Sequence, residues 1–376
     1  MITAIQILIF VLFLTALGYY AMIAIFTYGW YKLKSGFEPE TLPETKVTIV
    51  VALRNEENNI LKLLENFKAL IYPKELLEIV LVNDHSTDNT VKFVEDFIIT
   101  NPELNIKLLN AENKGKKNAI KTGVEQASNN FILTTDGDCS PGKLWVRKMA
   151  AYYQKYNPAV ILAPVVYRKK KSMLQRMFSL EFISLVASGA GAAGAGVPFM
   201  GNAANMGFEK NILKKNLKEK FASGDDVFLI HSAKKSYGSK SIHFLKDASV
   251  IMETEPPQTV GEFLKQRLRW GSKAKGYNDF VAASVSFLVF AFNFGLFLMF
   301  LLAFMYHWLF VVWFLFIALK TLMDLPLLQG FARLTGNTDL IIFIFPLEFV
   351  YPFYITFTAI ASLVLNYTWK DRKNLK

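Results

Sequence analysis

The chain reads FILTTDGD at residues 131–138, where a short apolar and β-branched run stops at two aspartates separated by a glycine. Similar runs, typical of buried strands, recur at residues 46–53, 77–82 and 106–109. Segments with apolar residues at helical spacing lie between them, at residues 56–69, 87–99 and 118–127. Ser86 or Thr87 is the expected N-cap of the second helix. Strands that alternate with helices predict an α/β fold with a mostly parallel sheet.

Polar clusters follow three of the four predicted strands. They are Arg54-Asn55-Glu56, Asn83-Asp84 and Asp136-Gly137-Asp138. Open parallel sheets bind ligands beyond the carboxyl ends of their strands. We therefore expect the three clusters to share one edge of the sheet and to form a binding site there.

Asp136 and Asp138 are the candidate metal ligands. Two carboxylates at a strand end can face one cavity, and hard oxygen ligands suit Mg²⁺ or Mn²⁺ together with substrate phosphates. An ordinary Asp-Gly turn is the simpler interpretation of this pair by itself. The buried strand before it and the neighbouring clusters favour the metal site.

Two further residues near the predicted edge have chemistry that suits a nucleotide. Asp84 can accept a hydrogen bond from a base or a ribose hydroxyl, while Ser86 and Asp88 cap the next helix. Lys116 precedes a predicted helix and can reach a phosphate beside the helix N-terminus. A solvated lysine is the commoner case, so both interpretations of Lys116 stay open.

A second acidic pair and an aromatic motif lie downstream. Asp225-Asp226 precedes an apolar helical run, where the pair either favours the helix N-terminus or supplies a general base for an acceptor hydroxyl. Gln266, Arg269 and Trp270 belong to the string QRLRW. Arg269 can neutralise a diphosphate and Trp270 can stack on a sugar or lipid head, although an amphipathic interfacial helix also explains this composition.

Both ends of the chain are apolar, and the middle is not. Residues 2–30 carry no charge and are long enough to cross a hydrocarbon layer of ~30 Å. Residues 278–328 suffice for two spans with a turn at Tyr306-His307, and residues 341–365 form a third candidate. The first basic residues, Lys32 and Lys34, follow the first span, which predicts a cytosolic middle domain. Three C-terminal spans would leave the basic tail outside, so the count of these spans stays open.

Lys320, Asp324 and Glu348 lie inside the apolar runs. Buried charges there need partners, and Lys320 and Asp324, four residues apart, are expected to pair on one helix face. The stretch GAGAAGAG at residues 189–196 is either a tightly packed or flexible connector, or a small-residue interfacial helix that a lipid acceptor approaches.

The composition and charge of the chain indicate which kinds of molecule it binds. The chain of 376 residues carries a net charge of +11 and has a mean hydropathy of +0.27, too apolar for an ordinary soluble enzyme. Its basic residues cluster partly beside apolar segments, which favours membrane lipids and a diphosphate ligand, and we expect no nucleic-acid partner. Cys139 is the only cysteine, so no intramolecular disulfide forms.

In this order, the clusters resemble the motifs of the family-2 glycosyltransferases, particularly the membrane-embedded branch that includes cellulose, chitin and hyaluronan synthases and ceramide glucosyltransferase. The resemblance covers about residues 46–276. LRNE at residues 53–56 is similar to the family's first loop, and NDHSTD at 83–88 to its nucleotide-binding DDGSxD, with Asn83 and His85 as departures. Gly115-Lys116 is similar to its GK, and Asp136 and Asp138 to its DxD. Asp225-Asp226 stands where ED is usual, and Gln266, Arg269 and Trp270 match QxxRW.

The resemblance implies a GT-A fold and a nucleotide-sugar donor, namely a UDP-sugar. It implies an inverting displacement in which Asp226 takes the acceptor proton and Arg269, with Mg²⁺ or Mn²⁺ on Asp138, stabilises the leaving diphosphate. Arg54, Glu56, Asp84, Lys116 and Asp136 would bind the nucleotide-sugar. The Asn83 and His85 departures affect the expected recognition of the base, and leave the metal and the general base untouched.

The expected organisation is an N-terminal membrane helix at residues 1–34, a cytosolic GT-A domain at 35–277 and a C-terminal membrane region at 278–376. The leading hypothesis is an enzyme of a bacterial inner membrane that adds one sugar to a lipid-linked or other membrane-associated glycan acceptor. A processive polysaccharide synthase is the first alternative, but the chain has no FxVTxK-like gating string. The alternatives of other classes are a non-catalytic membrane protein that binds nucleotide-sugars and a soluble nucleotidyltransferase, which would not need QRLRW or the spans.

Overall fold

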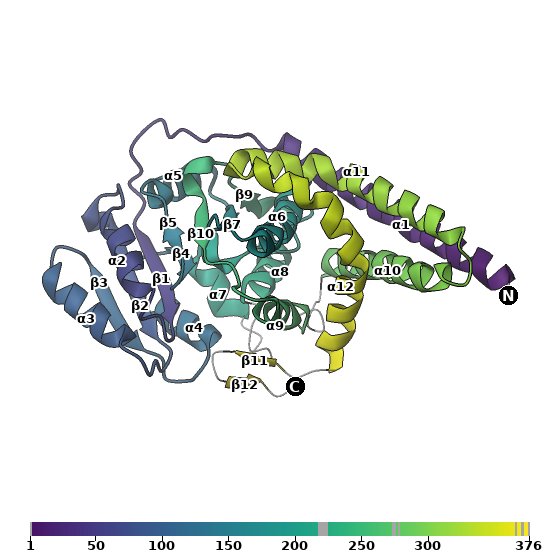
Figure 1. Ribbon diagram of the computed structural model, residues 1–376. Helices are drawn as coiled ribbons and strands as arrows, with labels where there is room; N and C mark the ends of the chain where they lie inside the picture. The colour runs from purple at the N-terminus through teal and green to yellow at the C-terminus, as the bar shows by residue number, and fades with distance from the viewer. Residues whose placement is uncertain are drawn as a thin grey trace. The chain divides into compact units, whose positions relative to one another are not determined.

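The computed structural model describes residues 2–216, 225–272, 276, 279–364, 367–369 and 372–374. The chain forms two compact units, each assembled from separate segments. The sheet unit comprises residues 33–168 and 196–256, and the helical unit comprises residues 1–32, 169–195 and 257–376. Figure 1 labels most of their elements.

A seven-stranded sheet forms the centre of the sheet unit, in the order β3-β2-β1-β4-β8-β6-β9. Its strands are β1 (Val47–Leu53), β2 (Leu77–Asn83), β3 (Ile106–Asn110), β4 (Phe131–Asp136), β6 (Val160–Leu162), β8 (Met206–Glu209) and β9 (Ile242–Phe244). β1 pairs in parallel with both β2 and β4, and β8 alone runs against its neighbours among these strands. The predicted mostly parallel α/β sheet is confirmed.

Helices connect the strands and cover the sheet. They are α2 (Ile60–Lys68), α3 (Thr90–Thr100), α4 (Lys116–Gln126), α5 (Trp145–Tyr156), α7 (Lys210–Asn216) and α8 (Asp225–Tyr237). The chain moves one way along the sheet through α2 and α3 and back through α4, so right-handed crossovers place α4 on the other face. α4 packs tightly there, because a Cβ at Gly123 would lie 2.5 Å from Cγ1 of Val50.

Two predicted helix starts were wrong by a few residues. α2 begins at Ile60 instead of residue 56, because Asn55 takes a left-handed conformation with φ of 50° and the chain turns before the helix. α3 begins at Thr90, and its N-cap position is Asn89. Neither Ser86 nor Thr87 caps it. Instead Asp88 accepts hydrogen bonds from the backbone N–H and the hydroxyl of Thr90, at 3.1 and 2.6 Å.

A small second sheet lies beside the carboxyl end of β4. It consists of β5 (Ser140–Pro141), β10 (Met252–Thr254) and β7 (Val165–Tyr167). β5 begins two residues after Asp138, so the pairing of β5 with β10 brings Glu253 and Thr254 near the aspartates. The second sheet belongs to the sheet unit and lies next to the predicted site.

The helical unit contains the long apolar helices α1 (Ile2–Lys32), α6 (Met173–Gly194), α10 (Phe280–Ala303), α11 (Leu309–Thr335) and α12 (Ile344–Val364). With a short 3₁₀ turn before α12, these give five candidate membrane spans among the described residues. The predicted turn at Tyr306-His307 is confirmed, since it separates α10 from α11. α9 (Val260–Gly271) and the antiparallel pair β11 (Tyr367–Trp369) and β12 (Arg372–Asn374) complete the unit.

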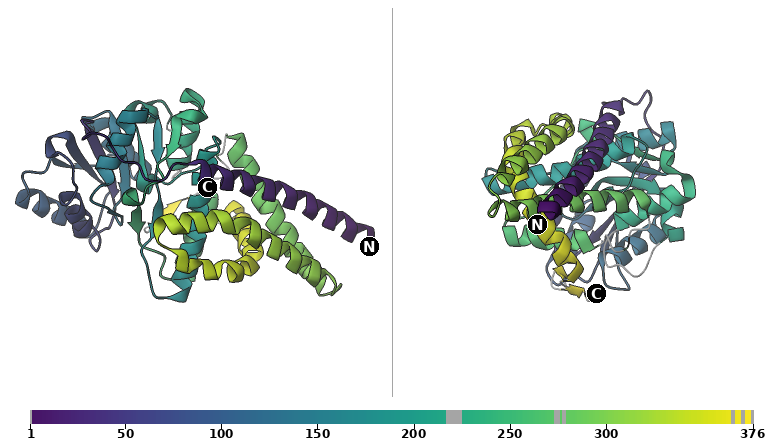
Figure 2. Two further views of the ribbon diagram at one scale, coloured as in Figure 1. Left: turned by 90° about the horizontal axis from the view of Figure 1, so that it is seen from above. Right: turned by 90° about the vertical axis from the view of Figure 1, so that its right-hand side faces the viewer.

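α6 crosses α1 and α11 instead of running along them, as Figures 1 and 2 show. Trp30 and Phe331 bring the C-terminal ends of α1 and α11 together, with ring centroids 5.4 Å apart. Just before α6, Lys169 Nζ donates to the Gly336 carbonyl at 2.6 Å, and near its end Gly191 lies against the Phe26 backbone. A helix of 22 residues is about 33 Å long, so with both ends at one end of α1 and α11 it must lie across them.

The close contact also resolves one alternative for GAGAAGAG. Residues 189–194 belong to α6, and a Cβ at Gly191 would lie 2.3 Å from the carbonyl oxygen of Phe26. The small residues therefore let α6 and α1 approach backbone to backbone. Tight packing is confirmed for this stretch, and the approach of a lipid acceptor stays a prediction.

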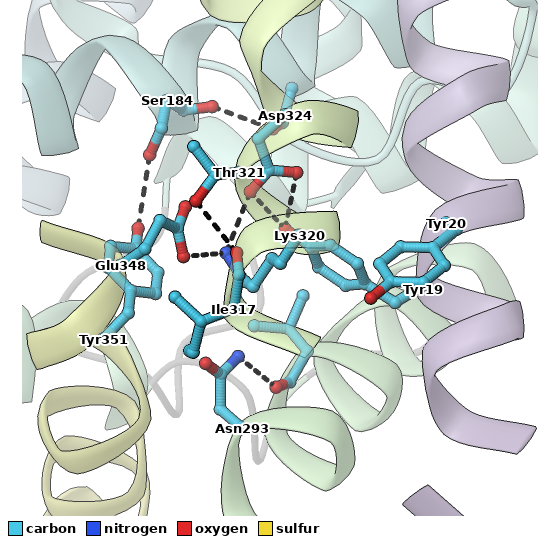
Figure 3. Close-up of polar contacts among 12 residues, drawn as sticks. Tyr19, Tyr20, Ser184, Asn293, Ile317, Lys320, Thr321, Asp324, Glu348 and Tyr351 are labelled. Atoms are coloured by element: carbon cyan, nitrogen blue, oxygen red, sulfur yellow. Dashed lines mark hydrogen bonds and ion pairs between the residues drawn. The ribbon is translucent and has the colours of Figure 1, made fainter. Parts of the chain in front are cut away.

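The charges predicted to pair inside the apolar runs do so, and a third joins them (Figure 3). Lys320 Nζ contacts Asp324 Oδ2 at 2.8 Å and Glu348 Oε2 at 2.6 Å. The Tyr19 hydroxyl donates to both oxygens of Asp324 at 2.9 and 2.8 Å. α1, α11 and α12 are thus joined by one buried polar cluster, and burial of these charges without partners would be costly.

Parts of the expected cytosolic domain, residues 35–277, pack with the membrane helices. Residues 169–195, which include α6, and the region from residue 257 onward, which includes α9, belong to the helical unit. The sheet unit is therefore interrupted by α6 and ends before α9.

Candidate active site

The carboxyl ends of β1, β2 and β4 place the predicted clusters at one edge of the sheet. In register, Leu53 pairs with Asn83, and Ala52 pairs with Asp136. The strand order turns back between β1 and β4, because β2 and β3 lie on one side of β1 and β4 lies on the other. Such a switch point is where open α/β sheets bind ligands.

Arg54 and Asp84 are linked across the β1 and β2 ends. The Asp84 N–H donates to the Leu53 carbonyl at 2.7 Å, and Arg54 Nη1 donates to the carbonyls of Asp84 and His85 at 3.0 and 2.9 Å. Asp84 is buried, and its Oδ1 accepts from the Gly115 N–H at 2.8 Å. The carboxylate predicted to bind a nucleotide therefore also holds the loop before α4, where Gly115 has a φ of +117° that glycine tolerates.

The two departures from the family pattern have local consequences. Asn83 Nδ2 donates to Asn110 Oδ1 at 2.8 Å, a bond that an ionised aspartate could not donate, and Asn83 Oδ1 accepts from the Ser86 N–H at 2.9 Å. His85 adopts a left-handed φ of 56°, a conformation in which the family's glycine would be unstrained. Asn83 thus joins the ends of β2 and β3 by its own side chain.

Lys116 and Asp136 form an ion pair with an Nζ–Oδ1 distance of 2.5 Å. Lys116 is the first residue of α4, and Asp136 is the last of β4. Both side chains are partly exposed. A phosphate bound at the N-terminus of α4 would lie near the ammonium group of Lys116, which Asp136 already holds in position.

Gly137, the glycine between the two aspartates, lies against the side chain of Glu56. A Cβ at Gly137 would be 2.7 Å from Cγ of Glu56, so the DGD loop rests directly against that side chain. Asp138 Oδ2 accepts from the Thr254 hydroxyl at 3.1 Å. Burial, together with the charges of Asp136 and Glu56, raises the pKa of Asp138 to about 6.

The donor set fits a divalent cation. Three carboxylates, those of Glu56, Asp136 and Asp138, interact closely enough to raise the pKa of Asp138, and Lys116 offsets only part of this charge. Among the described residues, no three acidic, histidine or cysteine side chains are arranged to hold an ion by themselves. Magnesium and manganese commonly take one or two protein carboxylates and complete their shell with phosphate oxygens. The residues present suit that arrangement.

Asp225 and Asp226 begin α8 in the sheet unit. Asp226 Oδ1 accepts from the Val227 N–H at 2.8 Å, which is consistent with the expected effect of acidic residues on a helix N-terminus. α8 is anchored further along, where His231 Nε2 lies 3.1 Å from the Phe199 carbonyl oxygen. The role of Asp226 as general base stays a prediction.

Gln266, Arg269 and Trp270 all lie on α9, in the helical unit. The Thr259 side chain caps the start of the helix, because its hydroxyl accepts from the Glu262 N–H at 3.2 Å, and Glu262 Oε2 accepts from the Gln258 N–H at 2.8 Å. The C-terminal part of α9 packs on α12, since a Cβ at Gly271 would lie 3.1 Å from Ser362. The motif thus has a fixed place among the membrane helices.

Two residues that contact the predicted ones, Thr254 and Arg267, were not predicted from the sequence, and neither was Glu181, the partner of Arg267. Thr254 bonds Asp138, and a buried ion pair between Arg267 and Glu181 lies beside Gln266 and Trp270. The sequence contained a signal for this pair: Glu181 is a carboxylate within an apolar helix, and Arg267 is the first of the two arginines of QRLRW. No pattern in the sequence pointed to Thr254.

Part of the chain matches a known protein family, and parts of it are similar in sequence to known proteins. Residues 48–239, about half of the chain, match the family described as "Glycosyl transferase family 2". Poly-beta-1,6-N-acetyl-D-glucosamine synthase of Staphylococcus aureus is 33% identical over 147 residues, which are 37% of this chain and 33% of that protein. Glycosyltransferase AglE of Haloferax volcanii is 33% identical over 102 residues, 27% of this chain and 33% of that one. The matched region thus spans about a third of these relatives.

A solved structure is similar over almost the whole chain. Mannosyltransferase PcManGT from Pyrobaculum calidifontis, in complex with GDP-Man and Mn²⁺, superimposes with a TM-score of 0.60 and 18% identity, covering 96% of this chain and 97% of that one. At this identity the likeness concerns the fold. The GT-A fold expected from the sequence is confirmed.

Proposed function

Because the chain belongs to glycosyl transferase family 2, we propose that it transfers a sugar from a UDP-sugar to a membrane-associated, lipid-linked acceptor, with inversion at the anomeric carbon. The observation that carries the proposal is the polar edge at the β1/β4 switch point. Arg54, Asp84 and Lys116 lie there beside the carboxylates of Glu56, Asp136 and Asp138. This combination suits a ligand with a polar base and a diphosphate.

The donor is held by this edge. Asp84 and Arg54 bind the nucleoside, and Lys116 and the N-terminus of α4 face the phosphates. Asp138 and Asp136 would hold Mg²⁺ or Mn²⁺, which would supply charge neutralisation for the diphosphate. Thr254 keeps Asp138 oriented through the bond to Oδ2.

The transfer is a single displacement. Asp226 accepts the proton of the acceptor hydroxyl while that oxygen bonds to the anomeric carbon. The bond from the anomeric carbon to the diphosphate breaks, and the electron pair leaves with the diphosphate, whose charge Arg269 stabilises. Gln266 and Trp270 contact the acceptor side. The transition state resembles an oxocarbenium ion, as in other glycosyl transfers.

The membrane helices support an acceptor in or on the bilayer. Five helices are long and apolar enough to cross a membrane, and the QRLRW helix packs among them. We infer an inner-membrane location with the sheet unit in the cytosol, which is where nucleotide-sugars are available.

The test is a donor panel with the purified protein in lipid vesicles. UDP-glucose, UDP-GlcNAc and GDP-mannose are supplied with Mn²⁺ or Mg²⁺. The molecular masses of the products in the lipid fraction are then measured by mass spectrometry. We expect a lipid product heavier by one sugar from a UDP-sugar. Asp226→Asn should lower its rate by roughly 100-fold or more, and Asp96→Asn, an exposed aspartate on α3, should not. Equal rates for Asp226→Asn and wild type would remove Asp226 from the mechanism.

A processive polysaccharide synthase is the second candidate. The observation that favours it is the sequence similarity to a polysaccharide synthase over 147 residues. It predicts long polymer from the purified protein. Product size distinguishes it from single transfer.

A further inference from the structure

Arg267 is buried in α9 between two residues of the QRLRW motif. Its Nε donates to Oε1 and Oε2 of Glu181 at 2.9 and 3.0 Å, and Nη2 also contacts Glu181 Oε2. Glu181 lies on α6 and is buried as well. Contacts from two guanidinium nitrogens to one carboxylate fix the plane of the guanidinium group.

The same guanidinium group holds the motif. Arg267 Nη1 donates to Gln266 Oε1 at 2.7 Å, and its Cζ lies 4.2 Å from the ring centroid of Trp270. On the opposite side along the helix, Phe263 lies 4.5 Å from the same carbon. Arg267 therefore contacts two members of the motif, Gln266 and Trp270, while Glu181 fixes the orientation of its guanidinium group.

Glu181 is in turn fixed by α12. The Tyr354 hydroxyl donates to Glu181 Oε1 at 3.1 Å, and Ser184 on α6 lies 3.3 Å from the Tyr351 hydroxyl. The Tyr351 ring is 4.9 Å from Lys320 Nζ, which belongs to the charged cluster in Figure 3. The Ser184 hydroxyl also donates to the Glu181 carbonyl at 2.7 Å, so hydrogen bonds and one cation–ring contact link the cluster in α11 and α12, through α6, to α9.

We propose that Arg267 is a positioning residue, which Glu181 holds in place so that Gln266 and Trp270 keep the orientation that sugar transfer requires. The proposal rests on the proposed function of the motif. A role in stability alone does not explain the arrangement, because buried ion pairs add little stability compared with apolar residues of the same size. Small displacements of groups around a reacting centre, by contrast, cost much of the rate.

The critical variant replaces both partners, Glu181→Leu with Arg267→Met. It leaves no unpaired charge, so the helices should stay packed and the thermal unfolding midpoint should stay near that of the wild type. If Arg267 positions the motif, the double variant still loses roughly 10- to 100-fold in kcat for sugar transfer, with KM for the donor little changed. If the pair serves stability alone, kcat recovers with the unfolding midpoint, and the proposal is overturned.

Two single variants sharpen the comparison. Arg267→Lys keeps the charge but cannot contact Glu181, Gln266 and Trp270 with one planar group, so kcat should fall as in the double variant. Lys265→Gln removes a positive charge from an exposed position on the same helix and should match the wild type. A Lys265→Gln variant as impaired as Arg267→Lys would mean that the charge of α9 matters and the position of Arg267 does not.

A second measurement does not depend on turnover. Tryptophan is replaced by 5-fluorotryptophan, and the ¹⁹F resonance of Trp270 is identified by its absence from Trp270→Phe. We expect one sharp Trp270 resonance in the wild type and a shifted, broadened one in the double variant. An unchanged resonance would overturn the proposal, even if no donor in the panel is used. Failure of the wild type to use any donor, with the resonance change present, would instead count against the proposed function of the motif.

Discussion

Two carboxylates of the sheet unit have pKa values shifted in opposite directions. Burial and the charges of Asp136 and Glu56 raise the pKa of Asp138 to about 6. Burial also acts to raise the pKa of Glu78, but hydrogen bonds from Lys107, Thr48 and Ser128 outweigh it and lower the pKa to about 2. Glu78 is satisfied by the protein and joins β1, β2 and β3, whereas Asp138 sits among like charges and suits an added cation. The difference separates a structural residue from a candidate ligand.

The lowered pKa of Glu78 predicts an acid-dependent loss of stability. An unfolded glutamate titrates near 4.5, so the ionised network stabilises the fold fully above that pH and loses its effect as the pH falls towards 2. The contribution is at most about 3 kcal/mol near neutral pH. We expect Glu78→Gln to lower the thermal unfolding midpoint at pH 7 and to differ little from the wild type at pH 2.5. A difference that does not depend on pH would contradict the assignment.

Among elements, the packing of α6 on α1 depends on glycine. In Gly191→Ala, the new Cβ would lie 2.3 Å from the Phe26 carbonyl oxygen, a backbone atom that cannot rotate away. We expect a loss of about 1 to 3 kcal/mol in the free energy of unfolding. Gly261→Ala on α9 is the control, because its Cβ meets only the Thr259 hydroxyl at 3.8 Å and alanine favours a helix. Equal effects of the two substitutions on the unfolding midpoint would refute the close contact.

The buried cluster of α1, α11 and α12 predicts unequal effects of its members. Lys320 is the only ammonium facing Asp324 and Glu348 in the contacts described. Lys320→Met leaves two buried carboxylates without their cation and should cost about 3 to 5 kcal/mol. Glu348→Gln leaves Lys320 paired with Asp324 at 2.8 Å and should cost less. Unfolding midpoints measured in one lipid mixture check the order, and a larger loss for Glu348→Gln would contradict it.

The first four strands could be predicted from the sequence more accurately than the helices between them. A parallel strand buried on both faces is a continuous apolar run, and β1, β2, β3 and β4 lie within one or two residues of their predicted ranges. The starts of α2 and α3 could not, because they depend on Asn55 in a left-handed conformation and on Asp88 bonded to Thr90. α6 was missed as a continuous helix because Glu181 and its glycines interrupt an otherwise apolar pattern.

The division of the whole molecule into two units could not be predicted, because the segments of the two units alternate along the chain. α6 and α9 belong with the membrane helices, although strands of the sheet unit lie between them in sequence. The polar edge of the sheet was predictable because parallel strands bring their carboxyl ends together. The partners of α6 and α9 were not, since the Glu181–Arg267 pair joins residues far apart in sequence.

The length of the product is a property of the whole molecule. The sequence carries QRLRW but no gating string of the kind that processive synthases show between their spans. We therefore expect a single sugar on the acceptor, even at long reaction times and with excess donor. Chromatography of the labelled lipid fraction gives the size distribution. A ladder of increasing length, or high-molecular-weight polymer, would favour the synthase.

Metal-dependent sugar transfer at the polar edge of the sheet is tested by the release of nucleoside diphosphate from a UDP-sugar by the purified protein in lipid vesicles. It is measured with Mn²⁺ and with a chelator, for the wild type, Asp138→Ala and the exposed control Asp96→Ala. We predict that release needs the metal in the wild type and in the control, and that it is lost in Asp138→Ala. Release by Asp138→Ala equal to that of the wild type, or unaffected by the chelator, would contradict it.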